Sequence, residues 1–112
     1  MKECYLILPE KPSPFLKKMI AFTTENVDYK ILDDFTHIPD LKNKKIIFAV
    51  ELPITGISNN LNNFFIRLFK RGKDSLKGSE AIVLIHSNYQ LYTKTTAQNI
   101  IFQSNLLGCR FP

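Results

Sequence analysis

The chain has 112 residues, which is the length of one ordinary domain and too short for two. Hydrophobic residues make up 45% of it and charged residues 22%, with only 4 Gly and 6 Pro, a balance that excludes a disordered chain and a fibrous protein. Fifteen Lys and Arg oppose ten Asp and Glu, and the net charge of +5 favours anionic partners without identifying one. We therefore predict a single globular domain over residues 1–112.

The first part of the chain contains the signals of two strands and one helix. The continuous apolar run Cys4–Leu8 is typical of a strand that is covered on both faces of a parallel sheet. Ser13 is a helix N-cap residue followed by proline, which predicts a helix over Pro14–Glu25 whose apolar face consists of Phe15, Leu16, Met19 and Ile20. Val27–Leu32 alternates weakly and predicts a shorter strand, whereas Asp33–Asn43 is polar, has no clear period and predicts a connection.

The middle of the chain has the clearest signals. Lys45–Leu52 contains five consecutive apolar residues and predicts a central strand. A helix follows, with Ser58 as its predicted N-cap and Gly72 as a left-handed residue that ends it after two cations. Its apolar residues recur at i, i+3, i+4, i+7 and i+8, a stripe that we expect in the core: Leu61, Phe64, Phe65, Leu68 and Phe69.

The last part of the chain repeats this alternation. Ala81–Ile85 predicts another strand, and a last helix is predicted to begin at Thr93 or Thr95 and to stop at Gly108. Cys109–Pro112 is predicted to begin another extended segment. Strands that alternate with helices in this way require repeated right-handed crossovers and a mainly parallel sheet.

We therefore predict a doubly wound α/β domain of the flavodoxin-like type, a three-layer α/β/α structure with about four strands. If the strands have the flavodoxin-like order 2-1-3-4, the order reverses between the first and third strands. Ligands of such sheets bind beyond the carboxyl ends of the strands, where the strand order reverses. Three loops meet that condition: Pro9–Ser13, Glu51–Ser58 and His86–Tyr92. Folds of this kind continue with a fifth strand and a last helix, so we expect an incomplete C-terminus with an open sheet edge.

Two segments resemble the flavodoxin-like family of NAD(P)H-dependent flavin and quinone reductases. In that family a hydrophobic third strand leads through a flavin-contacting loop into a helix, as Ile46–Val50 leads into Gly56–Phe69 here. The Leu, Phe and Arg of the family helix match Leu61, Phe64 and Arg67. The resemblance covers most of residues 45–112 and includes two shorter matches, Leu76–Gly78 and Leu107–Cys109.

The resemblance implies an FMN-binding, NAD(P)H-dependent oxidoreductase that forms a homodimer and binds flavin and a nicotinamide nucleotide. The cofactor would perform the hydride chemistry, and no residue is expected to act as a covalent nucleophile. Ser13 would contact the phosphate, residues 53–56 the flavin ring, and Asn88 and Tyr89 its edge. The full set of candidate cofactor-binding residues is Lys11, Ser13, Glu51, Pro53, Ile54, Thr55, Gly56, Ser58, His86, Ser87, Asn88, Tyr89 and Tyr92.

Two of the three loops depart from the family pattern. The first loop of the family is rich in Ser, Thr, Gly and Asn, because backbone N–H groups and hydroxyls hold a phosphate there. Here Pro9, Pro12 and Pro14 supply no N–H groups, and Glu10 adds a negative charge. The loop after the third strand lacks the aromatic residue that would cover the flavin ring. The alternative hypothesis is a flavodoxin-like interaction or regulatory domain that has lost flavin binding.

The remaining chemical signals admit simpler interpretations. His86 is either part of a ligand-facing loop or only the end of a strand. His37 lies near three aspartates without the spacing of a metal site, so no metal is expected. Two basic clusters, at residues 42–45 and 70–77, contain no interleaved aromatic residues, so we interpret them as solvated and do not expect nucleic-acid binding.

The location of the protein is also predicted from the sequence. Cys4 and Cys109 lie near opposite ends of the chain, which is typical of reduced thiols and not of a disulfide scaffold. Cys4 is expected in the core. The first nine residues do not resemble a signal peptide, and no apolar run approaches the roughly 20 residues of a membrane helix. We expect a cytoplasmic protein that does not associate with a membrane.

Overall fold

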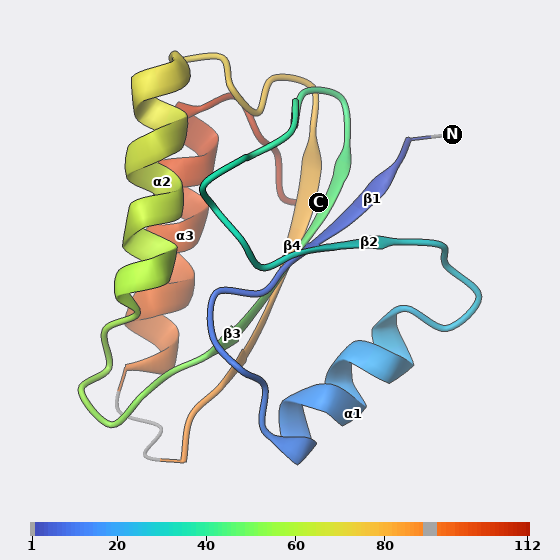
Figure 1. Cartoon of the computed structure of the whole chain (residues 1–112), viewed down its shortest axis with the longest axis vertical. Coiled ribbons are helices and arrows are strands. Elements are labelled where there is room, and N and C mark those ends of the chain that lie inside the picture. The colour runs from blue at the N-terminus through green and yellow to red at the C-terminus, as the bar shows by residue number, and fades with distance from the viewer. Residues whose placement is uncertain (1, 89–91) are drawn as a thin grey trace.

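The computed structural model describes residues 2–88 and 92–112 and contains seven elements in the predicted order (Figure 1). They are β1 (Cys4–Ile7), α1 (Pro14–Thr23), β2 (Lys30–Leu32), β3 (Lys45–Glu51), α2 (Asn59–Arg71), β4 (Glu80–His86) and α3 (Thr93–Leu106). Both predicted serine caps are present: Ser13 Oγ accepts a hydrogen bond from Leu16 N at 3.2 Å, and Ser58 Oγ accepts one from Leu61 N at 3.2 Å.

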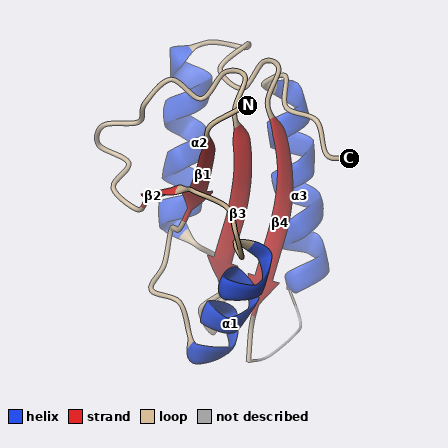
Figure 2. Ribbon diagram, turned by 90° about the vertical axis from the view of Figure 1, so that its right-hand side faces the viewer, coloured by secondary structure: helices blue, strands red, loops and turns tan. Residues whose placement is uncertain are grey.

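The four strands form one parallel sheet in the order β2-β1-β3-β4. Helix α1 covers one face of the sheet, and α2 and α3 lie side by side on the other (Figures 1 and 2). The prediction of a flavodoxin-like, three-layer α/β/α fold is therefore confirmed. In the register of β3 with β4, Glu51 lies opposite His86 where both strands end.

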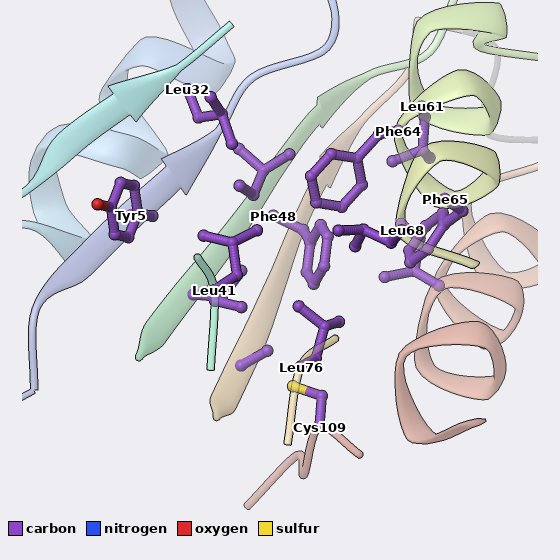
Figure 3. Packing of buried hydrophobic residues seen from close by; sticks show 14 of the residues in the cluster. Tyr5, Leu32, Leu41, Phe48, Leu61, Phe64, Phe65, Leu68, Leu76 and Cys109 are labelled. Carbon is purple, nitrogen blue, oxygen red and sulfur yellow. The ribbon is translucent and has the colours of Figure 1, made fainter. Parts of the chain in front are cut away.

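The two faces of the sheet explain why its strands are continuously apolar. Along β3, Ile46, Phe48 and Val50 belong to the larger core cluster, which packs under α2 and α3. Ile47 and Ala49 belong to the smaller cluster under α1. In Figure 3, Phe48 lies at the centre of the larger cluster, surrounded by side chains that include Leu41, Phe64, Phe65 and Leu68. Both faces of the central strand are therefore buried, as the uninterrupted run predicts.

Two aromatic residues that were predicted on apolar helix faces are exposed. Phe69 was expected in the core, but 41% of it is exposed because it lies at the margin of the α2 stripe. Phe15 is 61% exposed in the first turn of α1, whereas Leu16 and Ile20 are the buried residues of this helix.

Some predicted boundaries also differ. Helix α1 ends at Thr23 and not at Glu25, since Thr24 forms the cap and Asn26 adopts a left-handed φ of 61°. The second strand begins only at Lys30, after this turn. Gly72 caps α2 with a positive φ of 147°, but its ψ of 161° is extended and not left-handed helical, because the chain leaves the helix into a further turn.

The residues after α3 lie along the outer edge of β4. Arg110 forms a parallel bridge with Glu80, and the Ala81 N–H donates to the Arg110 carbonyl at 2.8 Å. The Phe111 ring stacks on Phe48 with centroids 6.5 Å apart, which holds this segment against the core. The predicted extended segment at Cys109–Pro112 is therefore present. No helix in the described part of the chain has both the length and the apolar character needed to cross a membrane.

Candidate functional site

The predicted loops come together beyond the carboxyl ends of β1, β3 and β4. The parallel register places Glu51 beside His86. The loop after β1 leads to Ser13, which is the N-cap of α1. The strand order reverses between β1 and β3, so this edge is the switch point of the fold.

Ser13, Glu51 and His86 form one hydrogen-bonded group, which we call the Glu51 cluster. Glu51 Oε1 accepts a hydrogen bond from the Ser13 backbone N–H at 2.9 Å, and Glu51 Oε2 lies 2.6 Å from His86 Nδ1. Ser13 Oγ lies 3.2 Å from the same ring nitrogen. The Phe15 ring stacks on the imidazole with centroids 4.9 Å apart. One carboxylate thus joins the ends of two strands to the start of a helix.

The carboxylate of this cluster is stabilised in its ionised form. The side chains of Glu51 and His86 are only 16% and 18% exposed. Burial on its own would raise the pKa of Glu51, but the hydrogen bonds from Ser13 and His86 outweigh it and lower the pKa below its ordinary value. Glu51 is therefore negatively charged at neutral pH, and its charge faces the N-terminus of α1, where the helix dipole favours it.

The Glu51 cluster does not have the geometry of a nucleophilic triad. In a triad the imidazole uses one nitrogen for the nucleophile and the other for the acid. Here Ser13 Oγ and Glu51 Oε2 contact the same nitrogen, Nδ1, and Ser13 Oγ also caps the Leu16 N–H. The arrangement therefore anchors three elements to one another and does not activate Ser13.

A second carboxylate ties the first loop to α2. Glu10 Oε1 accepts hydrogen bonds from Ser58 Oγ at 2.9 Å and from Asn60 Nδ2 at 3.2 Å. The same Asn60 amide donates to the Pro9 carbonyl at 2.9 Å. A carboxylate of the protein itself therefore lies at each of these two helix N-termini, Glu51 at α1 and Glu10 at α2.

The second and third loops meet at Gly56. Its φ is 74°, and a Cβ built on it would lie 2.2 Å from Tyr92 Cδ2, so the Tyr92 ring packs directly on the glycine backbone. A side chain at this position would displace the tyrosine. The preceding residues, Pro53, Ile54 and Thr55, are exposed, with Ile54 68% exposed.

The other candidate residues are more dispersed. Lys11 and Asn88 are exposed, and Ser87 is buried at the end of β4. Tyr89 lies outside the described residues. The structure therefore joins Ser13 to Glu51 and His86, Gly56 to Tyr92, and Ser58 to the first loop. Within residues 2–88 and 92–112, no group of three or more His, Cys, Asp and Glu side chains is placed to hold a metal ion.

Two residues that form contacts at this site were not among the candidates predicted from the sequence. Glu10 was recognised only as a repulsive charge, yet it binds the α2 cap. Phe15 was assigned to the apolar face of its helix, yet it stacks on His86. The available signal was the residue order: a carboxylate three residues after a strand and an aromatic two residues after the cap both lie near the edge where the strands end.

The two cysteines do not supply a nucleophile. Both are free and buried, with 6% of Cys4 and 3% of Cys109 exposed. Burial raises the pKa of both thiols, and that of Cys109 to about 11. We expect the native protein at pH 8 to react with a thiol reagent such as DTNB far more slowly than denatured protein, which releases both thiols. Fast labelling of either cysteine without denaturant would contradict their burial.

Comparisons with known proteins find no family model that matches the sequence and no match among the curated proteins.

Proposed function

We propose that this chain is a flavodoxin-like interaction or regulatory domain without a flavin phosphate site. The observation that supports this proposal most is the hydrogen bond from the Ser13 N–H to the Glu51 carboxylate. In a phosphate site at a helix N-terminus, a free backbone N–H of this kind would bind the ligand. Here an internal anion already occupies it.

The charge at this edge also opposes a bound phosphate. Two like unit charges about 4 Å apart repel each other by about 4 kcal/mol at the effective dielectric near a protein surface. A phosphate at the start of α1 would face ionised Glu51, with Glu10 on the adjoining loop. A typical hydrogen bond to a charged group returns only about 1.5 to 3 kcal/mol. Pro12 and Pro14 remove two of the backbone donors that could supply such bonds.

The second candidate function is an FMN-binding, NAD(P)H-dependent oxidoreductase that acts as a homodimer. Its support is positional: the Glu51 cluster, Gly56 and Tyr92 lie at the switch point, where this fold class binds ligands. Exposed Pro53 and Ile54 would offer an apolar surface to a flavin ring. In this candidate the nicotinamide nucleotide would approach the same edge.

Visible absorption separates the two candidates. We expect that purified protein incubated with excess FMN shows no flavin band at about 450 nm after gel filtration. A parallel sample with riboflavin, which has no phosphate, tests whether an apolar ring site exists without a phosphate site. Circular dichroism confirms that the protein is folded. Stoichiometric retention of FMN would reject the interaction-domain proposal and favour the oxidoreductase.

A further inference from the structure

The two basic clusters of the sequence are joined in the structure at the amino ends of β3 and β4. The Asn43 N–H donates to the Lys77 carbonyl at 3.0 Å, and the Lys44 N–H donates to Ser79 Oγ at 2.9 Å. Gly78 packs so closely on Asn43 that an added Cβ would lie 2.0 Å from the amide oxygen. Segments more than 25 residues apart in the chain are thus held side by side, at the end of the sheet opposite the Glu51 cluster (Figure 1).

This end of the molecule carries a concentration of cations that we call the amino-edge surface. Lys44 pairs with Glu3 at 3.2 Å. Arg71 donates to the Ile38 and Pro39 carbonyls, which fixes its guanidinium beside the loop before β3. The members of the surface are Lys42, Lys44, Lys45, Arg71, Lys73 and Lys77.

Four of these cations form no ion pair within the described residues: Lys42, Lys45, Lys73 and Lys77. All four are exposed. Lys42 and Lys45 lie in or beside β3, so attraction to a helix C-terminus does not explain their position as it does for Arg71 and for Lys73, which directly follows the α2 cap. Grouped like charges repel each other and attract anionic partners at long range.

The surface is also hollowed. A depression of about 600 Å³ lies between the end of α2 and the loop before β3. Three cations line it, Lys42, Arg71 and Lys73, together with two carboxylates, Asp40 and Asp74. A ligand in this depression therefore meets both positively and negatively charged side chains.

This charge pattern distinguishes between classes of polyanion. A nucleic-acid strand carries a phosphate on every nucleotide, so it cannot omit negative charge where it passes Asp40 and Asp74. The lining of the depression also contains no aromatic side chain on which a base could stack. A peptide can place its carboxylates against the lysines and uncharged or basic residues against the aspartates.

We propose that the amino-edge surface binds an acidic segment of a partner protein. The inference names a partner class for the interaction function proposed above and rests on it. The two are tested separately, because flavin retention reports on the carboxyl edge of the sheet and peptide binding reports on the amino edge.

The probe is a fluorescein-labelled 12-residue peptide of alternating Glu, Ser, Asp and Gly, measured by fluorescence anisotropy at 50 mM and 300 mM NaCl. We expect saturable binding at low salt that weakens at high salt, because exposed charge pairs are screened over about a Debye length. The test variant is Lys42→Glu/Lys73→Glu, for which we expect affinity to fall about tenfold or more. The matched control, Lys17→Glu/Lys18→Glu, makes the same charge change at exposed positions of α1 and should alter affinity less than about threefold.

The outcomes that overturn the proposal are distinct. Absence of peptide binding at 50 mM NaCl rejects the surface as a binding site, and equal losses in the two double variants show that only net charge matters. Tighter binding of a labelled 12-nucleotide single strand than of the peptide favours nucleic acid instead. The milder variant Lys42→Ala/Lys73→Ala should show a smaller loss in the same direction, and thermal unfolding checks that each variant is folded.

Discussion

Phe48→Ala should destabilise the protein by about 3 to 5 kcal/mol, the typical cost when a large aromatic side chain is deleted from a core. Phe48 is fully buried in the central strand and its ring contacts Phe64, Phe65 and Phe111. These partners come from α2 and from the segment after α3, so no single element can move to fill the cavity. The change is measured as the free energy of unfolding in urea, and a small domain has only about 5 to 15 kcal/mol in total.

The matched control for this prediction is Phe22→Ala. Phe22 is 82% exposed on α1, so the same truncation there should change stability by no more than about 0.5 kcal/mol. If Phe48→Ala leaves too little folded protein to measure, Phe48→Leu retains most of the volume and should cost about 1 to 2 kcal/mol. Similar losses at positions 48 and 22 would show that the assigned core is wrong.

The architecture could be predicted because the strands are buried on both faces. An uninterrupted apolar run such as Ile46–Val50 occurs where helices cover both sides of a sheet, and the alternation with helices then restricts the topology. The same run does not reveal which residue faces which helix, since both faces are apolar. That information came from the structure, in which Phe48 faces α2 and Ile47 faces α1. The exposure of Phe69 was missed because helical spacing defines a stripe but not its margins.

The sequence predicts which residues lie at the candidate site better than it predicts the contacts between them. The strand order alone places the residues after β1, β3 and β4 at one edge, and Ser13, Glu51 and His86 are indeed together there. Their hydrogen bonds were not predictable, because they depend on the exact β3–β4 register and on the path of a proline-rich loop. The role of Glu10 illustrates this limit: its charge was evident, but its contact with Ser58, 48 residues away in the chain, is a product of the tertiary fold.

Glu51→Gln should lower the free energy of unfolding at pH 7 by about 1.5 to 3 kcal/mol, the usual contribution of hydrogen bonds to a charged group. Glutamine keeps the shape of the side chain, but it lacks the charge that faces His86 and the start of α1. Because Glu51 ends β3 and its two oxygens bind the start of α1 and the end of β4, the variant weakens the attachment of β3 to both α1 and β4. The measurement is urea unfolding of the wild type and the variant at several pH values.

The pH dependence of this difference identifies its origin. Folding lowers the pKa of Glu51 from its ordinary value of 4.5, so the stabilisation by its charge is complete above that pH and is lost as the pH falls through the lowered pKa. The gap between wild type and Glu51→Gln should therefore be largest near neutral pH and shrink toward pH 3. Glu25→Gln, at an exposed position just after α1, should produce no more than about 0.5 kcal/mol at any pH. A gap that stays constant with pH would mean that the shape of the side chain, and not its charge, holds the three elements together. In that case the fold would not need the negative charge of Glu51 at the start of α1, and this helix N-terminus would be available to an external anion.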